Sequence, residues 1–269
     1  MDVNLREKIH DANIEVHRFE AEHYELLHPE VYHREEQQRI NSTLMMADHL
    51  IENNQKKALD FGAGTGNLTS KLLQMGYSVK AVDISPEMCA ILKKRYAAYL
   101  TAQRLTVINS PIEDVSFEKD EFDLITCYSV LHHFPDYKSA LWRLTAFLKK
   151  GGVMYVDHEA SPFYWQNETK LFSNVLKFIY FHTNPTLNAL YFKIIGFKVP
   201  YIDYTLSDFW HKKERPLDHH AIERVFHRGG FEFFKRSDYH LKGSWFPNPI
   251  FYFYKNLCRP EMSYWVAKK

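Results

Sequence analysis

Short apolar runs alternate with helical patterns from Lys56 to Glu159, and this alternation limits the possible folds more than any other feature of the chain. The apolar runs are KALDF, SVKAVDI, LTVIN, FDLITCY and GGVMYVDHE, and helix-like stretches begin at Leu68, at Pro86 and near Tyr137. Ser85 before Pro86 is typical of a helix start, because serine caps the first turn and proline fits its first position. The repeated alternation predicts an α/β fold with a parallel sheet and helices on both faces.

The regions outside this alternation divide the chain into four parts. Residues 1–53 predict an N-terminal helical cap, 54–160 the alternating core, 161–216 an insertion rich in aromatic side chains, and 217–269 a C-terminal completion of the sheet. In the last part the helical pattern DHHAIERVFHRGG precedes the runs FEFFKRSDY and PIFYFYKNL, which predict an antiparallel hairpin. We expect the segment KKGG at 149–152 to end a helix, because lysine suits the dipole of a helix C-terminus and glycine its exit.

The composition favours a neutral or small partner. Lys and Arg number 34 against 33 Asp and Glu, so no basic surface indicates nucleic acid or an anionic membrane. Cys89, Cys127 and Cys258 match no paired metal-ligand spacing and indicate reduced thiols in a cytoplasmic protein. The charged N-terminus does not resemble a signal peptide, and no run of roughly 18 apolar residues predicts a membrane span.

A glycine-rich loop follows the first predicted strand, at the edge where parallel sheets bind ligands. Gly62, Gly64 and Gly66 have the spacing G-x-G-x-G, and Asn67 stands where the third glycine of a dinucleotide-binding loop would be. A Walker loop is excluded, because no Lys-Ser or Lys-Thr follows at the required distance. The position therefore favours a nucleotide-like ligand, and the spacing departs from that of a dinucleotide-binding loop.

Two acids narrow the choice of ligand. Asp83 ends the next predicted strand, where a carboxylate accepts from both ribose hydroxyls of an adenosine group. Asp60 lies just before the glycine loop and suits an ammonium group. The amino-acid tail of S-adenosylmethionine offers such an ammonium, so the pair of acids favours this cofactor.

Four motifs resemble, in order and spacing, those of class I S-adenosylmethionine-dependent methyltransferases. They are LDFGAGTGNLT, VKAVDIS, SPIEDVSFEKDEFDLITCYSVLHHFPD and LKKGGVMYVDHE, and the branch they resemble includes the ubiquinone and menaquinone biosynthesis methyltransferases and many small-molecule methyltransferases. The resemblance covers about residues 56 to 160. It implies a Rossmann-like sheet of seven strands with the last strand antiparallel, and S-adenosylhomocysteine as the second product.

The resemblance also implies which residues contact the cofactor. Those expected around it are Asp60, Gly62, Gly64 and Gly66 at the methionine moiety, Asp83 at the ribose, Ile84 and Met88 at the adenine, and Ser129 near the methionine tail. One departure concerns the adenine. Members of this type often have Gly-Asp-Ala where this chain has Ser110-Pro111-Ile112, so Ser110, Glu113 or the backbone of Ile112 is expected to replace the missing aspartate.

Acid and histidine side chains at two strand ends are candidates for catalysis. Methyl transfer to a hydroxyl needs the proton removed, and histidine suits this near neutral pH. His132 is the first candidate for the base, followed by His158, with Asp157 and Glu159 as groups that orient a histidine. Packing under a short helix is an equally good reading of His132 and His133. Neighbouring strand residues point to opposite faces, so not all of 157–159 can face the ligand.

Cover for the acceptor is expected from the N-terminal helices and from the insertion. Tyr24, Tyr32, His133 and Trp165 are the expected substrate contacts, and the histidines before residue 34 lack a metal-ligand spacing, so no metal is predicted. The aromatic side chains of the insertion have four alternative roles: they form a wall of the site for an apolar acceptor, a dimer interface, a contact with a membrane surface, or a helical core.

The sequence predicts an enzyme that methylates a hydroxyl of a small, partly apolar molecule. Methylation of carbon or nitrogen and a cofactor-binding subunit without catalysis are the alternatives, and a nicotinamide-dependent reductase is a more distant one. We expect the partner to be a small-molecule acceptor and not nucleic acid, and we expect no membrane span. A homodimer is an open alternative.

Overall fold

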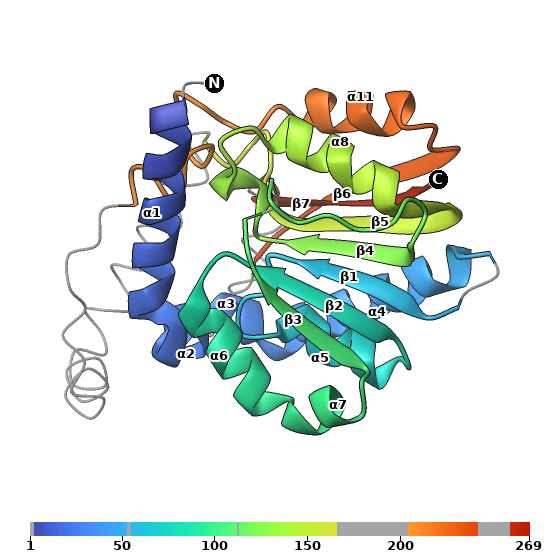
Figure 1. Ribbon diagram of the computed structural model, residues 1–269. Helices are drawn as coiled ribbons and strands as arrows, with labels where there is room; N and C mark the ends of the chain where they lie inside the picture. Colours follow the sequence, from blue (N-terminus) through green and yellow to red (C-terminus); the bar gives the residue numbers. More distant parts are fainter. Residues whose placement is uncertain (1–2, 53–54, 112, 166–203, 242–258) are drawn as a thin grey trace.

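The computed structural model describes residues 3–52, 55–111, 113–165, 204–241 and 259–269, and all structural statements below concern these residues. They form a seven-stranded sheet with the order β3-β2-β1-β4-β5-β7-β6 (Figure 1). The strands are β1 (Lys57–Phe61), β2 (Ser78–Asp83), β3 (Leu105–Asn109), β4 (Phe122–Tyr128), β5 (Leu148–Ala160), β6 (Phe233–Tyr239) and β7 (Met262–Lys268). Neighbours among β1 to β5 pair in parallel, and β7 pairs antiparallel with both β5 and β6. The predicted Rossmann-like sheet with an antiparallel last strand is confirmed.

Helices cover both faces of this sheet (Figure 1). They are α1 (Val3–Glu20), η1 (Ala21–His23), α2 (Tyr24–Leu27), α3 (Pro29–Tyr32), α4 (Arg34–Leu50), α5 (Asn67–Gln74), α6 (Pro86–Arg95), α7 (Ala97–Thr101), η2 (Leu131–His133), α8 (Tyr137–Phe147) and α11 (His219–Arg228). The strands alternate between two apolar clusters: Ile125 packs in the cluster that includes α8 and α11, and Leu124 in the one that includes α4 and α5. Burial on both faces explains why the strands read as apolar runs in the sequence.

Side-chain caps fix the helix starts that the sequence predicts. Ser85 Oγ accepts from the backbone N–H of Met88 at 3.3 Å, at the start of α6. Asp218 accepts in the same way from Ala221 at 3.1 Å, at the start of α11. Each cap satisfies a backbone N–H that has no partner inside its helix.

The segment at 149–152 does not end a helix, as the sequence analysis expected. α8 ends at Phe147, and residues 148–152 already belong to β5. Leu148 pairs with Phe122, and the Lys149 ammonium contacts the buried Asp123 carboxylate at 2.8 Å. The positive charge therefore compensates an acid of β4 rather than a helix dipole, and glycine accommodates the irregular register at this edge.

Within the described ranges, the run FEFFKRSDY finds its antiparallel partner near the end of the chain. β6 pairs with β7, at Met262–Lys268, and the predicted hairpin partner PIFYFYKNL at 249–257 lies outside the described residues. Trp265 and Val266 are fully buried on opposite faces of β7, so β7 contributes side chains to the apolar clusters on both sides of the sheet.

The N-terminal helices lie beside the ends of the parallel strands. Figure 1 shows α1 standing across the edge at which β1, β2 and β4 end. None of the helices in the described ranges is long and apolar enough to cross a membrane. The division of the chain into four parts stays a prediction.

Candidate functional site

The glycine loop is held between the end of β2 and the residues that follow β4. The N–H groups of Gly62 and Ala63 donate to the carbonyl of Val82 at 2.9 and 3.0 Å. Gly62, Gly64 and Gly66 all have positive φ angles, of 69°, 53° and 98°. A β-carbon on Gly62 would lie 2.2 Å from Cγ2 of Val130, whereas one on Gly64 would meet open space. The loop therefore needs glycine at position 62 for two separate reasons, conformation and contact.

This difference leads to a matched prediction for two loop variants. Gly64→Ala is expected to lower the free energy of unfolding by about 1–2 kcal/mol, the cost of a left-handed backbone for a residue with a β-carbon. Gly62→Ala carries the same cost plus overpacking against Val130, which adds about 1–3 kcal/mol. Urea unfolding of both variants checks the order. Equal losses, or no recovery when Val130→Ala is added to Gly62→Ala, contradict it.

A pocket of about 690 Å³, part of it open to solvent, lies beside this loop. Its lining includes most of the residues expected at the cofactor, namely Gly62, Gly64, Asp83, Ile84, Met88, Ser110 and Ser129, and two expected substrate contacts, Tyr24 and His133. Ile112 lies outside the described residues. The lining also includes residues that the sequence analysis did not expect, namely His10, Asn13, His17, Phe61, Val82, Pro111, Tyr128, Val130 and Phe134, and it includes Glu113, one of the adenine alternatives.

Asp83 is oriented at the end of β2 by two backbone donors. Its carboxylate accepts from the N–H of Gly64 at 2.7 Å and from the N–H of Ser85 at 2.8 Å. Burial raises the pKa of this carboxyl above its usual value. The acid thus joins the glycine loop to the start of α6, at the place expected for a ribose.

Asp60 lines a second, adjoining pocket of about 370 Å³. Its carboxylate accepts from the hydroxyls of Thr69 at 2.5 Å and Thr126 at 2.8 Å. Burial raises its pKa to about 6. Tyr24 and Tyr32 from the N-terminal helices line the same pocket. Because the pKa of this buried acid is close to neutral pH, a cation bound beside it would favour the ionised form of the carboxyl.

Gly66 has a different role from the other two loop glycines. It is the N-terminal cap residue of α5, and its carbonyl accepts from the Tyr96 hydroxyl at 3.4 Å. Its φ of 98° allows the chain to enter the helix directly from the loop.

His132 and Glu159 form a buried pair beside the pocket. Glu159 Oε2 lies 2.8 Å from Nδ1 of His132, and Oε1 accepts from the N–H groups of Val130 and Leu131 at 3.0 and 2.7 Å. Although burial opposes the charged form, the neighbouring carboxylate raises the pKa of His132. With Nδ1 bound to the acid, Nε2 is the ring nitrogen left for other chemistry.

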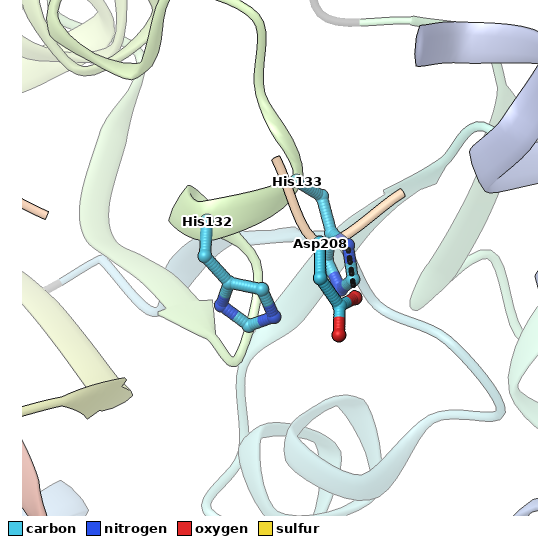
Figure 2. Close-up of side chains that lie close together, drawn as sticks. All are labelled: His132, His133 and Asp208. Carbon is cyan, nitrogen blue, oxygen red and sulfur yellow. Dashed lines mark ion pairs between the residues drawn. The ribbon is translucent and has the colours of Figure 1, made fainter. Parts of the chain in front are cut away.

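His133 lies on the same short turn, η2, and lines the larger pocket. Its Nδ1 lies 2.9 Å from the carbonyl of Ser207 and 3.6 Å from the carboxylate of Asp208 (Figure 2). Burial and the adjacent histidine lower its pKa well below the usual value. His133 therefore faces the larger pocket as a neutral ring.

Asp157 and His158 lie in a buried network on the other side of β5. The Arg39 guanidinium of α4 donates to Asp157 at 2.7 Å and to Glu36 at 2.6 Å. His158 Nδ1 lies 3.0 Å from the hydroxyl of Tyr128, which also donates to Glu36 at 3.0 Å. Arg39 holds the pKa of Glu36 at about 2 against the opposing effect of burial. The structure thus separates these two residues from His132, which the sequence analysis had grouped with them.

A β-bulge causes this separation. The pairing of β5 with β7 shifts between Val156 and Glu159, and His158 has a φ of 61°. In a regular strand Asp157 and Glu159 would share a face. Here Asp157 contacts Arg39 on the α4 side, whereas Glu159 contacts η2.

Trp165 stands apart from the two pockets described above. Its ring packs edge-on against Tyr164 and His211, with centroids 4.9 and 5.3 Å away. The His211 ring lies 5.4 Å from that of His132. Trp165 therefore approaches the catalytic candidates from the side of the insertion.

Comparison with known proteins defines the class of this domain. Residues 59–156 match the family described as a methyltransferase domain, a region that runs from β1 into β5. The sheet order, the acids at the strand ends and this match resemble those of class I S-adenosylmethionine-dependent methyltransferase domains. A methyltransferase of this class from Archaeoglobus fulgidus has a TM-score of 0.55 at 17% identity, over 92% of this chain and 100% of that chain.

Within the class, the chain resembles the ubiquinone branch. A ubiquinone biosynthesis O-methyltransferase of Vibrio parahaemolyticus is 35% identical over 118 residues, 44% of this chain and 48% of that protein. The ubiquinone/menaquinone biosynthesis C-methyltransferase of Geotalea daltonii is 26% identical over 145 residues, 53% of this chain and 60% of that protein. The chain spans about half the length of the first of these relatives.

Proposed function

We propose that the protein transfers the methyl group of S-adenosylmethionine to a hydroxyl of a small, partly apolar molecule and releases S-adenosylhomocysteine. The proposal is carried by one observation: a pocket at the glycine loop, with Asp83 at its wall, adjoins a turn that holds His133 and the His132–Glu159 pair. A cofactor site and groups able to assist a proton transfer thus meet at one edge of the sheet.

The cofactor would lie along the two adjoining pockets. Asp83 would accept from the ribose hydroxyls, and Asp60 would pair with the ammonium of the methionine tail. Ile84 and Met88 would contact the adenine, with Ser129 near the tail. Glu113 lines the larger pocket and has one carboxylate oxygen 3.6 Å from His10. In our proposal it contacts the adenine in place of the aspartate that is common in this branch.

The reaction is an in-line displacement. The acceptor oxygen forms a bond to the methyl carbon while the bond from that carbon to sulfur breaks, and the acceptor loses its proton. Positioning and exclusion of water supply much of the rate, because the sulfonium already activates the methyl group. His132 assists the loss of the proton in our proposal, since Glu159 fixes its ring and leaves Nε2 free of the carboxylate. His158 supports Tyr128 at the pocket wall, and Asp157 accepts from the backbone N–H of His158 at 2.6 Å.

Replacement of His132 tests this assignment. We expect His132→Gln to lower kcat by 10²–10⁴-fold, the usual contribution of general acid–base assistance, with the dissociation constant of S-adenosylmethionine changed less than twofold. Labelled methyl transfer to a panel of hydroxylated aromatic compounds is the measurement. His220→Gln, at a histidine whose side chain is 79% exposed, is the control and should leave both constants unchanged. A loss of less than tenfold in His132→Gln sinks the assignment.

Methylation of carbon is the second candidate, because the Geotalea relative is named as a C-methyltransferase. Mass spectrometry of the labelled product distinguishes an ether from a ring-methylated compound. Binding of S-adenosylmethionine without transfer to any acceptor would favour a regulatory subunit. A cytoplasmic location, an apolar acceptor and a homodimer remain parts of the proposal.

A further inference from the structure

The two histidines of η2 share a space with Asp208, which comes from a different segment of the chain. One ring nitrogen of His132, one of His133 and one carboxylate oxygen of Asp208 all lie within 4.8 Å of one another. Figure 2 shows both histidines on the same short turn and the Asp208 carboxylate beside His133, with the ion pair between these two drawn. We call these three residues the His132 cluster.

The partners of the two imidazole rings are those of metal-binding histidines. A histidine that binds a metal usually donates its other ring N–H to a carboxylate or a backbone carbonyl, which fixes the ring and its tautomer. His132 has Glu159 in this position, at 2.8 Å, and His133 has the carbonyl of Ser207 at 2.9 Å. Glu159 is itself fixed by two backbone N–H groups, so the orientation of His132 is set from outside the cluster.

The donor types select among metal ions. Two imidazoles and one carboxylate suit Zn²⁺ or Fe²⁺, whereas Mg²⁺ and Ca²⁺ prefer sites made of oxygen atoms. Ligand atoms about 2.1 Å from a tetrahedral ion lie about 3.4 Å from one another. Separations of up to 4.8 Å in the His132 cluster therefore have to shorten by as much as about 1.4 Å, and the Asp208 side chain, 32% exposed, has room to move.

Three protein ligands leave at least one coordination position open, as in catalytic zinc sites. His133 lines the cofactor pocket, so an ion in the cluster would lie beside the space in which the methyl group is transferred. A hydroxyl bound to such an ion loses its proton more readily, because the ion stabilises the resulting oxyanion.

We propose that His132, His133 and Asp208 bind a divalent transition-metal ion, Zn²⁺ or Fe²⁺, and that the acceptor hydroxyl occupies its open position. The bound hydroxyl releases its proton to solvent water, its oxygen forms the bond to the methyl carbon as the carbon–sulfur bond breaks, and the methylated product leaves the ion. His132 assists deprotonation as a ligand of this ion. The role of the ion in transfer rests on the proposed function, whereas the metal site itself does not.

Binding of Co²⁺ to the full chain tests the site independently of activity. After treatment with a chelator and dialysis, titration with Co²⁺ is expected to give visible absorption bands of a low-coordinate ion that saturate at one equivalent, and Zn²⁺ should displace it. Asp208→Asn should weaken Co²⁺ binding at least tenfold. Glu159→Gln should weaken it 10–100-fold, the usual effect of losing a partner of a metal-bound histidine. His220→Gln is the control and should bind as the wild type does.

The outcomes separate the two parts of the proposal. Absorption that does not saturate at one equivalent overturns the metal site. Equal affinity in the wild type, Asp208→Asn and Glu159→Gln, when circular dichroism shows them folded, overturns it as well. If the site binds one ion, methyl transfer by the chelated protein should rise at least tenfold on addition of Zn²⁺ or Fe²⁺. A transfer rate unchanged by the ion overturns its catalytic role, and one-to-one metal binding without transfer in any condition counts against the proposed function alone.

Discussion

Asp60→Asn is expected to weaken binding of S-adenosylmethionine 10–100-fold at pH 7.5, because a hydrogen bond to a charged group contributes about 1.5–3 kcal/mol. Isothermal titration with S-adenosylmethionine and S-adenosylhomocysteine measures this loss. Both ligands have the ammonium group, so both should lose affinity. Asp114→Asn, at an exposed acid, is the control and should bind both ligands as the wild type does.

The same variant has a distinct dependence on pH. Burial raises the pKa of Asp60 to about 6, and only the ionised carboxylate attracts an ammonium. The wild-type dissociation constant should therefore rise as the pH falls below about 6, approaching tenfold per pH unit, while that of Asp60→Asn should stay nearly level.

The stability of the protein without ligand should depend on pH in the opposite direction to cofactor binding. A carboxyl whose folded pKa lies above its unfolded value of 3.8 favours the fold most when protonated, and that contribution is lost as the pH rises through about 6. The variant without ligand should thus be at least as stable as the wild type at pH 7.5. If Asp60→Asn binds the cofactor more weakly but is also less stable than the wild type at pH 7.5, the assignment of Asp60 to the ammonium is contradicted.

Arg39→Met should produce the largest loss of stability, about 3–5 kcal/mol, because it leaves two buried carboxylates without their cation. The side chains of Glu36 and Asp157 are 5% and 0% exposed, and both contact the Arg39 guanidinium. Urea unfolding at pH 7.5 measures the change. Arg34→Met on the exposed side of the same helix is the matched control and should cost less than about 0.5 kcal/mol.

Neutral partners should restore part of the loss. Adding Glu36→Gln and Asp157→Asn to Arg39→Met removes the uncompensated charges, so the triple variant should be more stable than Arg39→Met alone. If Arg39→Met costs less than 1 kcal/mol, the network does not fix α4 to the sheet in the way that its geometry suggests.

The parallel strands and the turns around the glycine loop were predictable because their signals are local. A glycine needed for a positive φ, an acid at a strand end and a serine that caps a helix can each be recognised from a few neighbouring residues of the sequence. Gly62, Asp83 and Ser85 lie where those signals place them. The strand between β5 and β6 was harder to predict, because several apolar runs follow β6 in the sequence and only the pairing on both sides of Met262–Lys268 identifies it.

The acceptor side was less predictable because it depends on contacts distant in sequence. His10, Asn13 and His17 line the pocket, yet in the sequence they form part of an ordinary amphipathic pattern. Asp208 lies in a segment without periodicity, and nothing near it in the sequence indicates that it meets the two histidines of η2. The local pattern contains no information about which surface a helix or a loop covers.

The bulge in β5 allows one strand end to supply acids to two separate places. A protein engineer who transfers the pair formed by His132 and Glu159 to another scaffold must transfer the irregular backbone at His158 as well. If residue 158 kept its place but took the conformation of a regular strand, every chemical group of the pair would be retained, yet the Glu159 carboxylate would lie on the face of Asp157, away from its histidine. An alignment with a relative that lacks the bulge therefore needs a gap at this position, because without one it compares acids that face different sides of the sheet.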